Sequence, residues 1–180
     1  MNKKKFNKKV SLIPFNQLTG PIYCGWSLSP FGQCYILLQS NIVVGLAFKN
    51  NETKNKIETA IKAQWSKNAP KFEPLNTDQI AKDIFVRDIR INISFSGSQL
   101  QARVWKALLE ISRGETATYS FIAKKIKNPK AIRAVATAIG QNPIAWLIPC
   151  HRIIRKSGGL GGYRWGLKIK KLMLSNETQI

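Results

Sequence analysis

The sequence predicts an α/β protein with a small N-terminal α/β domain, residues 1–93, and a mainly helical C-terminal domain, residues 94–180, that contains a helix-turn-helix. Two observations support this prediction. Runs rich in β-branched and aromatic residues lie before residue 50, whereas apolar residues at helical spacing dominate after residue 95. With 44% apolar and 9% aromatic residues, a chain of 180 residues can build a real hydrophobic core.

Two strands joined at Ser40 and Asn41 form a predicted hairpin, residues 32–40 and 41–50, and residues 23–30 are expected to add a third strand. A loose basic arm is expected before this domain. Cys24 and Cys34 fall in the strands, and free cysteines are among the most buried residues, so we expect both in the core.

Two helices are expected to complete the N-terminal domain. The first lies in residues 52–67, and the second, in residues 76–88, starts with polar capping residues. One face of the first helix carries Ile57, Ala60, Ile61 and Trp65.

The C-terminal domain begins with a predicted helix in residues 98–111. Gly114 is expected to end it with a left-handed cap. Its apolar stripe consists of Leu100, Val104, Ala107, Leu108 and Ile111.

Residues 117–143 contain two short helical patterns separated by Lys-Asn-Pro, the outline of a helix-turn-helix. Ser120 is expected to cap the first helix, and Pro129 suits the first turn of the second. Ala131, Ala134 and Ala138 form a stripe of small residues beside Arg133. Spacing alone leaves two interpretations open: a helix packed tightly on its own core, or a helix inserted into a DNA groove.

The only histidine of the chain follows a cysteine, in the stretch Ile-Pro-Cys-His-Arg-Ile-Ile. A cysteine reacts as thiolate and needs a base, and the base needs a third group to orient it. Neighbours on an extended segment face opposite ways, so Cys150 and His151 would need a bridging water or a local turn. The pair is a candidate reactive centre, although packing alone also explains such a pair in an apolar run.

A glycine-rich segment, Gly158–Gly162, follows this pair and is bounded by apolar and helical stretches. It is typical of a shaped loop whose backbone approaches a ligand closely. Tyr163 and Trp165 offer flat faces that can grip a planar base.

The charge of the chain indicates a polyanionic partner. Lys and Arg number 29 against 9 Asp and Glu, a net charge of +20. Nucleic acid is the first candidate. An acidic membrane surface is second, but no run of about 18 apolar residues is present, so we expect no membrane partner.

A cytoplasmic protein without cofactor or metal is expected. The basic start of the chain lacks the apolar run and cleavage site of a signal peptide. Three scattered cysteines do not make a disulfide framework. A single histidine and no Cys-x-x-Cys leave too few ligands for a zinc site.

Residues 128–143, 148–154 and 161–174 together resemble the methylated-DNA–protein-cysteine methyltransferases, which repair O6-alkylguanine. The resemblance covers nearly all of residues 95–177, and it implies a ribonuclease-H-like arrangement for the N-terminal domain. It implies a stoichiometric S-methyltransferase, in which Cys150 takes the alkyl group irreversibly and each molecule acts once. The implied partner is double-stranded DNA containing alkylated guanine, bound in the minor groove by a monomer.

The resemblance also implies roles for individual residues. Cys150, His151 and Glu177 would form a relay through water, and Asn142 would brace the active-site turn. Tyr119 would help to rotate the target nucleotide and donate a proton. The residues implied in DNA binding are Arg133, Lys130, Ala131, Ala134 and Ala138, and those implied in holding the extruded base are Gly161, Gly162, Tyr163, Arg164 and Trp165.

Two positions depart from the family pattern. Leu100 stands where phenylalanine is common, and Arg164 stands where some relatives have a small hydroxyl residue. A bulky loop residue is expected to favour transfer of methyl over benzyl.

Two other functions remain as alternatives: a non-catalytic sensor of alkylated DNA, and a helix-turn-helix regulator that binds undamaged sequences. A sensor would lack the reactive cysteine, and a regulator needs base-reading side chains where this helix has alanines.

Overall fold

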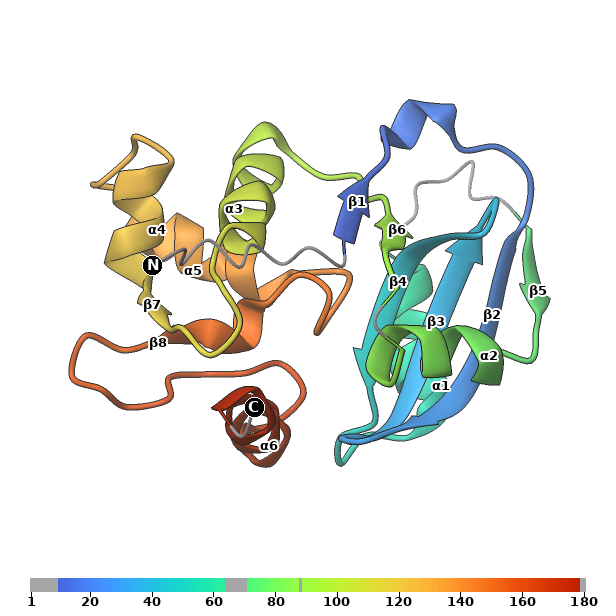
Figure 1. The fold of residues 1–180 in the computed structure, drawn as a ribbon. Helices are drawn as coiled ribbons and strands as arrows, with labels where there is room; N and C mark the ends of the chain where they lie inside the picture. Colours follow the sequence, from blue (N-terminus) through green and yellow to red (C-terminus); the bar gives the residue numbers. More distant parts are fainter. Residues whose placement is uncertain (1–9, 64–70, 88, 179–180) are drawn as a thin grey trace. The chain divides into compact units, whose positions relative to one another are not determined.

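The computed structural model describes residues 10–63, 71–87 and 89–178. The basic arm expected at the start of the chain and Trp65 lie outside these residues. The chain divides into two compact units between Phe95 and Ser96. The fold is mixed α/β, with a sheet unit followed by a mainly helical unit, as the sequence predicts (Figure 1). No helix in the described ranges is long and apolar enough to cross a membrane.

The N-terminal unit is built on a six-stranded sheet in the order β1-β6-β4-β3-β2-β5. The strands are β1 Val10–Leu12, β2 Ile22–Ser29, β3 Gly32–Gln39, β4 Ile42–Phe48, β5 Phe72–Pro74 and β6 Ile91–Ile93. The three long central strands β2, β3 and β4 are antiparallel. The short strands β5 and β6 pair in parallel with β2 and β4, and β1 pairs in parallel with β6. The predicted third strand is therefore confirmed.

The predicted hairpin at Ser40 and Asn41 is also confirmed. Both residues have positive φ, 50° and 61°. This is the backbone that a two-residue type I′ turn requires, because its twist matches the twist of the flanking strands.

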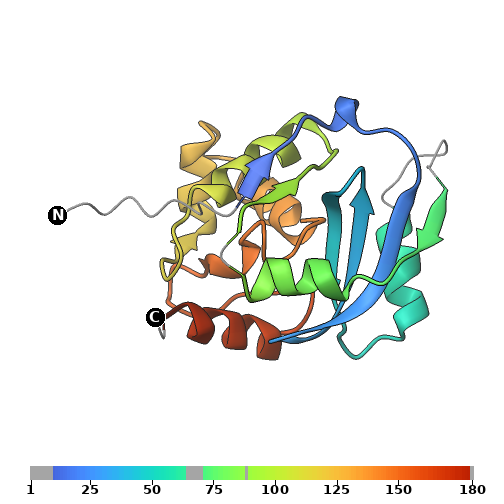
Figure 2. The same cartoon turned by 45° about the vertical axis from the view of Figure 1, so that its right-hand side comes forward.

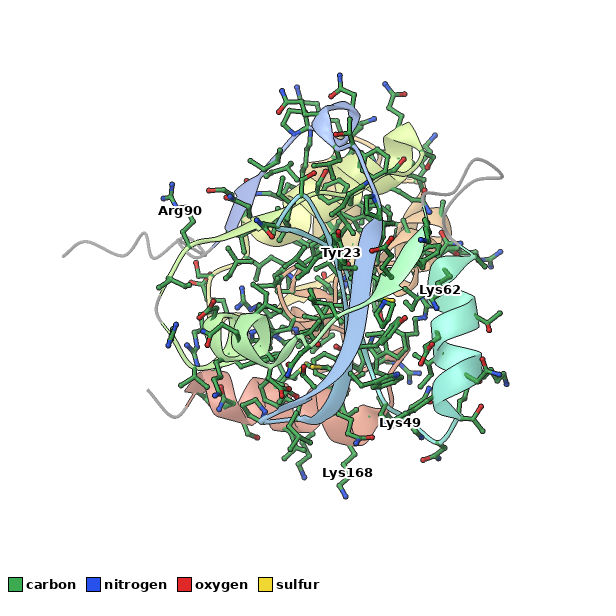
Figure 3. The ribbon with its side chains drawn as sticks, turned by 90° about the vertical axis from the view of Figure 1, so that its right-hand side faces the viewer. Tyr23, Lys49, Lys62, Arg90 and Lys168 are labelled. Carbon is green, nitrogen blue, oxygen red and sulfur yellow. The ribbon has the colours of Figure 1, made fainter. Side chains whose placement is uncertain are left out.

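Helices α1, Lys54–Lys62, and α2, Asp78–Phe85, belong to this unit, and α2 packs on β2 (Figure 2). Ile57 and Ile61 are buried as predicted, whereas Ala60 is exposed because the helix buries only a narrow face. Figure 3 labels Lys62 at the end of α1. Its ammonium lies 5.4 Å from the ring centre of Phe72, a cation–π contact with the face of the ring.

Aromatic rings fill the core of the N-terminal unit. Phe31, Phe48 and Phe85 contact one another edge to face with ring centres 6.0–6.1 Å apart. Cys24 and Cys34 are buried free thiols, as expected.

The C-terminal unit contains helices α3 Gln99–Leu109, α4 Tyr119–Lys125, α5 Ile132–Gly140 and α6 Leu167–Thr178, with a small parallel sheet of β7 Ala117–Thr118 and β8 Ile153–Ile154. A capping box between Ser98 and Gln101 starts α3. Most of the predicted stripe on α3 is buried, and Leu100 is half-buried. Trp105 is buried as well and donates from Nε1 to the carbonyl of Ala138, 2.8 Å away, which ties α3 to α5.

Three capping predictions in this unit are wrong. Helix α3 ends at Leu109, and Gly114, with φ +79°, shapes a separate turn farther on. Thr118 rather than Ser120 caps α4, because its Oγ1 accepts from the amide of Phe121. Pro129 precedes α5 instead of lying in its first turn, since the helix begins only at Ile132.

Candidate active site

Cys150 and His151 lie on a turn of 3-10 helix, Cys150–Arg152, that leads into β8. This turn explains how sequential neighbours can serve one site, because it removes the alternation of an extended segment. Cys150 is 7% exposed and His151 is completely buried. Both groups therefore work in a desolvated setting, where hydrogen bonds and charges act strongly.

Asn142 braces the turn from the end of α5. Its Nδ2 donates to the carbonyl of Ile148 at 2.8 Å and to Sγ of Cys150 at 3.0 Å. Its Oδ1 accepts from the amide of Ile144 at 3.0 Å. The buried amide of Asn142 therefore holds the backbone at Ile144 and at Ile148. It also donates to the sulfur of Cys150, and this hydrogen bond favours the thiolate.

Glu177, on α6, is the centre of a buried ionic network. His151 Nε2 lies 2.9 Å from Oε1 of Glu177. The guanidinium of Arg152 donates to both carboxylate oxygens, at 2.7–3.1 Å, and to the carbonyl of Ile111 at 2.6 Å. Because all three side chains are nearly inaccessible, each needs the others to offset its desolvation.

The protonation states follow from this network. Burial alone would raise the pKa of Glu177, but hydrogen bonds from His151 and Arg152 overcome it and lower the pKa to about 2. The carboxylate can only accept, so His151 carries its proton on Nε2. Burial lowers the pKa of His151, which favours the neutral ring. Its Nδ1 then has a lone pair, and among the residues described here it has no hydrogen-bond partner.

The thiol of Cys150 is not a spontaneous thiolate. Burial raises its pKa, and the hydrogen bond from Asn142 and the positive charge of Lys170 offset this only in part. A base is therefore needed to remove the proton. The neutral imidazole of His151 is the adjacent candidate.

A cavity of about 250 Å³ opens onto the sulfur. Of the residues predicted to act on the base or the methyl group, Tyr119, Asn142, Cys150, Gly162, Tyr163, Arg164 and Trp165 line it, together with Ala136, Ile139 and Gly140 of α5. Gly161 is not among the lining residues, but it has φ +70°, and a β-carbon there would be 3.0 Å from the hydroxyl of Tyr119, which does line the cavity. The glycine-rich loop is therefore a shaped wall of this cavity.

Lys170 holds this loop in place from α6. The side chain is completely buried, and its ammonium donates to the carbonyls of Ile153, Leu160 and Gly162. Burial lowers its pKa to about 8. Because an ammonium offers three donors, one side chain can satisfy carbonyls from both β8 and the loop.

The predicted DNA-binding residues at and near α5 differ in their exposure to solvent. Lys130, Arg133 and Ala134 are exposed, and Ala131 is half-buried at the start of the helix. Ala138 is only 2% exposed, so its assignment to the DNA-binding face is wrong. Its small size serves the close approach of α3, where Trp105 reaches its carbonyl.

Sequence reasoning missed three residues of the site: Arg152, Lys170 and Trp146. Trp146 stacks on the ring of His151 with centres 5.2 Å apart. A signal existed for Arg152, because an arginine within the largely apolar stretch 148–154 indicates a buried ion pair. Lys170 sits in a lysine-rich helix whose pattern does not mark one lysine as buried.

Comparison with known proteins agrees with this geometry. The model of the 6-O-methylguanine DNA methyltransferase DNA-binding domain matches residues 99–179. A methylated-DNA–protein-cysteine methyltransferase from Methanosarcina mazei is 41% identical over 133 residues, which cover 73% of this chain and 82% of that protein. The chain belongs to this family of DNA repair methyltransferases.

Other relatives are matched over a smaller part of their length. An inducible methylated-DNA–protein-cysteine methyltransferase from Bacillus subtilis is 46% identical over 52% of each chain. The regulatory protein ada from Salmonella typhimurium is 43% identical over 56% of this chain and 29% of its own length. The chain thus spans about half of one relative and less than a third of the other.

Solved structures of related proteins have the same fold as this chain. The Mycobacterium tuberculosis OGT in complex with DNA superposes with a TM-score of 0.70 at 30% identity and covers 87% of this chain and 92% of that one. The O6-methylguanine methyltransferase of Pyrococcus kodakaraensis has a TM-score of 0.61 at 22% identity, which supports the fold alone.

Proposed function

We propose that this protein repairs O6-methylguanine in duplex DNA by transferring the methyl group irreversibly to its own Cys150. The observation that carries the proposal is the position of the thiol, which faces a cavity large enough for a base edge and is held by Asn142. A buried, oriented imidazole follows it in the same turn. These are the parts that nucleophilic catalysis by cysteine requires.

The transfer is a displacement at the methyl carbon. The thiol proton passes through a water to Nδ1 of His151, whose Nε2–H remains bonded to Glu177. The sulfur forms a bond to the methyl carbon while the bond between that carbon and O6 breaks, and the electron pair stays with guanine. Tyr119, at the cavity wall, supplies the proton that makes the guanine neutral and is reprotonated from His151 through solvent. The thioether is not converted back to the thiol, so each molecule acts once.

DNA binding is assigned to α5 and the turn before it. Lys130 and Arg133 are exposed there and suit phosphate or minor-groove contacts. Extrusion of a base costs a few kcal/mol of stacking, so a side chain that fills the gap stabilises the flipped state. Arg133 is long enough and exposed enough for this role.

Arg164 is expected to limit the size of the alkyl group. Its guanidinium lies 4.7 Å from the ring centre of Trp165, so the two side chains form one wall of the cavity. We infer that methyl is transferred faster than benzyl.

The test is incubation of the purified protein with a duplex that contains one O6-methylguanine, followed by intact mass measurement. One added methyl group per chain, located on Cys150 and absent from Cys150→Ala, is the expected result. Tight binding to the lesion without a mass change would instead make the protein a damage sensor. Equal binding to damaged and undamaged duplexes would favour a helix-turn-helix regulator.

A further inference from the structure

Trp146 has a backbone conformation that bulky residues rarely adopt. Its φ is +69°, in the left-handed region that favours glycine and asparagine. It lies in the segment between Asn142 and Cys150, which also places the reactive thiol. Strain of this kind persists only where the surrounding structure compensates for it, and it is concentrated at functional sites.

The indole of Trp146 stacks on the ring of His151. Their ring centres are 5.2 Å apart and their planes differ by 13°. His151 is completely buried, whereas Trp146 is partly exposed. The indole therefore helps to shield the imidazole from solvent. Trp146 does not line the cavity over the sulfur and is therefore placed to act on His151 and not on a bound base.

We propose that Trp146 is a positioning residue for alkyl transfer, whose indole holds the His151 ring in the orientation that bonds Nε2 to Glu177 and keeps Nδ1 free to accept the thiol proton. This inference rests on the proposed function. Rotation of the ring away from the indole would break the 2.9 Å contact with Glu177.

Burial, to which the indole contributes, favours the neutral imidazole. The charged groups around His151 are Glu177 and Lys170 on α6 and Arg152 beside it in the turn. Glu177 favours the imidazolium, while Arg152 and Lys170 oppose it together with burial, which is the largest effect. An uncharged ring on the face of the imidazole excludes the water that would otherwise stabilise the charged form. Only the neutral form can act as base.

Two substitutions separate this role from a purely structural one. Trp146→Phe keeps an aromatic ring for stacking. Trp146→Gly removes the ring and suits the left-handed backbone, so it relieves strain. If the residue served folding alone, the glycine variant would lose stability, but the chemistry of its folded molecules would be unchanged.

The first measurement is an NMR titration of the imidazole in the free protein. Because the chain has one histidine, its signals need no further assignment. We expect an upfield ring-current shift in the wild type, retained in Trp146→Phe and lost in Trp146→Gly. The pKa of His151 should rise in the glycine variant. An unchanged titration in Trp146→Gly would overturn the inference.

The second measurement is the single-turnover rate of methyl transfer from the O6-methylguanine duplex as a function of pH. Trp146→Phe should stay within about twofold of the wild type, and Trp146→Gly should be roughly tenfold slower, with its acid limb moved to higher pH. Equal rates and profiles would overturn the inference, as would a phenylalanine variant as slow as glycine. If Trp146→Gly does not fold, Trp146→Leu takes its place in the same comparison.

The two measurements also separate this inference from the proposed function. A wild-type protein that transfers no methyl group would refute the function. The titration does not need DNA and decides the stacking role on its own.

Discussion

At the scale of single residues, Glu177 is the side chain on which the site depends most. Its carboxylate joins a base, His151, to a permanent cation, Arg152, in a volume closed to solvent. The family resemblance identified Glu177 and His151 as partners, and the structure brings them together. It did not indicate that Arg152 shares the same carboxylate, because spacing along a chain does not show which buried charge lies beside which.

Glu177 should make the stability of the protein depend on pH in the acid range. Its folded-state pKa, about 2, lies below the ordinary value of 4.5, so its stabilising contribution is complete above pH 4.5 and is lost as the pH falls towards 2. A difference of this size corresponds to roughly 3 kcal/mol. Urea unfolding at pH 7 and at pH 3 should show Glu177→Gln clearly less stable than the wild type at pH 7, and a smaller gap at pH 3. A gap of constant size would contradict the ionised, paired carboxylate.

At the scale of elements, the strands and the turn between them follow closely from sequence, whereas helix ends do not. Ser40 and Asn41 mark the hairpin because their backbone preference is local. Ser120 and Thr118 are both good caps by type, and the choice depends on where β7 ends and α4 begins. That boundary is set by pairing with β8, which is distant in sequence.

Removal of the observed cap should weaken α4. Thr118→Ala loses the acceptor for the amide of Phe121 and should cost about 1 kcal/mol of stability. Ser120→Ala is the comparison, because among the described residues this hydroxyl caps no amide and contacts only Oγ1 of Thr118, 3.0 Å away, so its cost should be well under half as large. Thermal or urea unfolding of both variants provides the comparison. A larger loss of stability in Ser120→Ala than in Thr118→Ala would support Ser120 as the cap, as the sequence suggested.

The glycine-rich loop offers a second comparison, between neighbouring glycines. Gly161 has φ +70°, and a β-carbon there would lie 3.0 Å from the hydroxyl of Tyr119. At Gly162, a β-carbon would meet no atom within 4 Å, and its φ lies outside the left-handed region. Gly161→Ala should therefore lower the free energy of unfolding by about 1–2 kcal/mol, and Gly162→Ala by a few tenths at most. Equal losses would mean that the loop is not held as a single shape.

At the scale of the whole molecule, the sequence predicted the mixed α/β fold and the family. Most of the predicted cavity residues line one cavity in the C-terminal unit. The buried side of α5 was harder to predict, because alanine suits a core contact and a groove contact equally well. Ala138 turned out to be core, while Ala134 is exposed. A monomer in the cytoplasm remains a prediction.

A chain with a net charge of +20 should bind DNA with an affinity that depends strongly on salt. Each phosphate contact releases condensed counterions, so the logarithm of affinity should fall linearly with the logarithm of salt concentration, with a slope of about −0.9 per contact. Arg133→Ala should reduce that slope by about one if the side chain binds a phosphate. If it fills the space left by the flipped base, the slope should change little, and methyl transfer should slow instead.

Arg90→Ala is the matched control for this experiment, because Arg90 is an exposed arginine of the N-terminal unit (Figure 3). It removes the same charge and leaves the residues of α5 unchanged. Fluorescence anisotropy with undamaged and O6-methylguanine duplexes, from about 50 to 200 mM salt, measures both slopes. Effects of Arg90→Ala as large as those of Arg133→Ala would mean that net charge, and not the surface of α5, determines DNA binding.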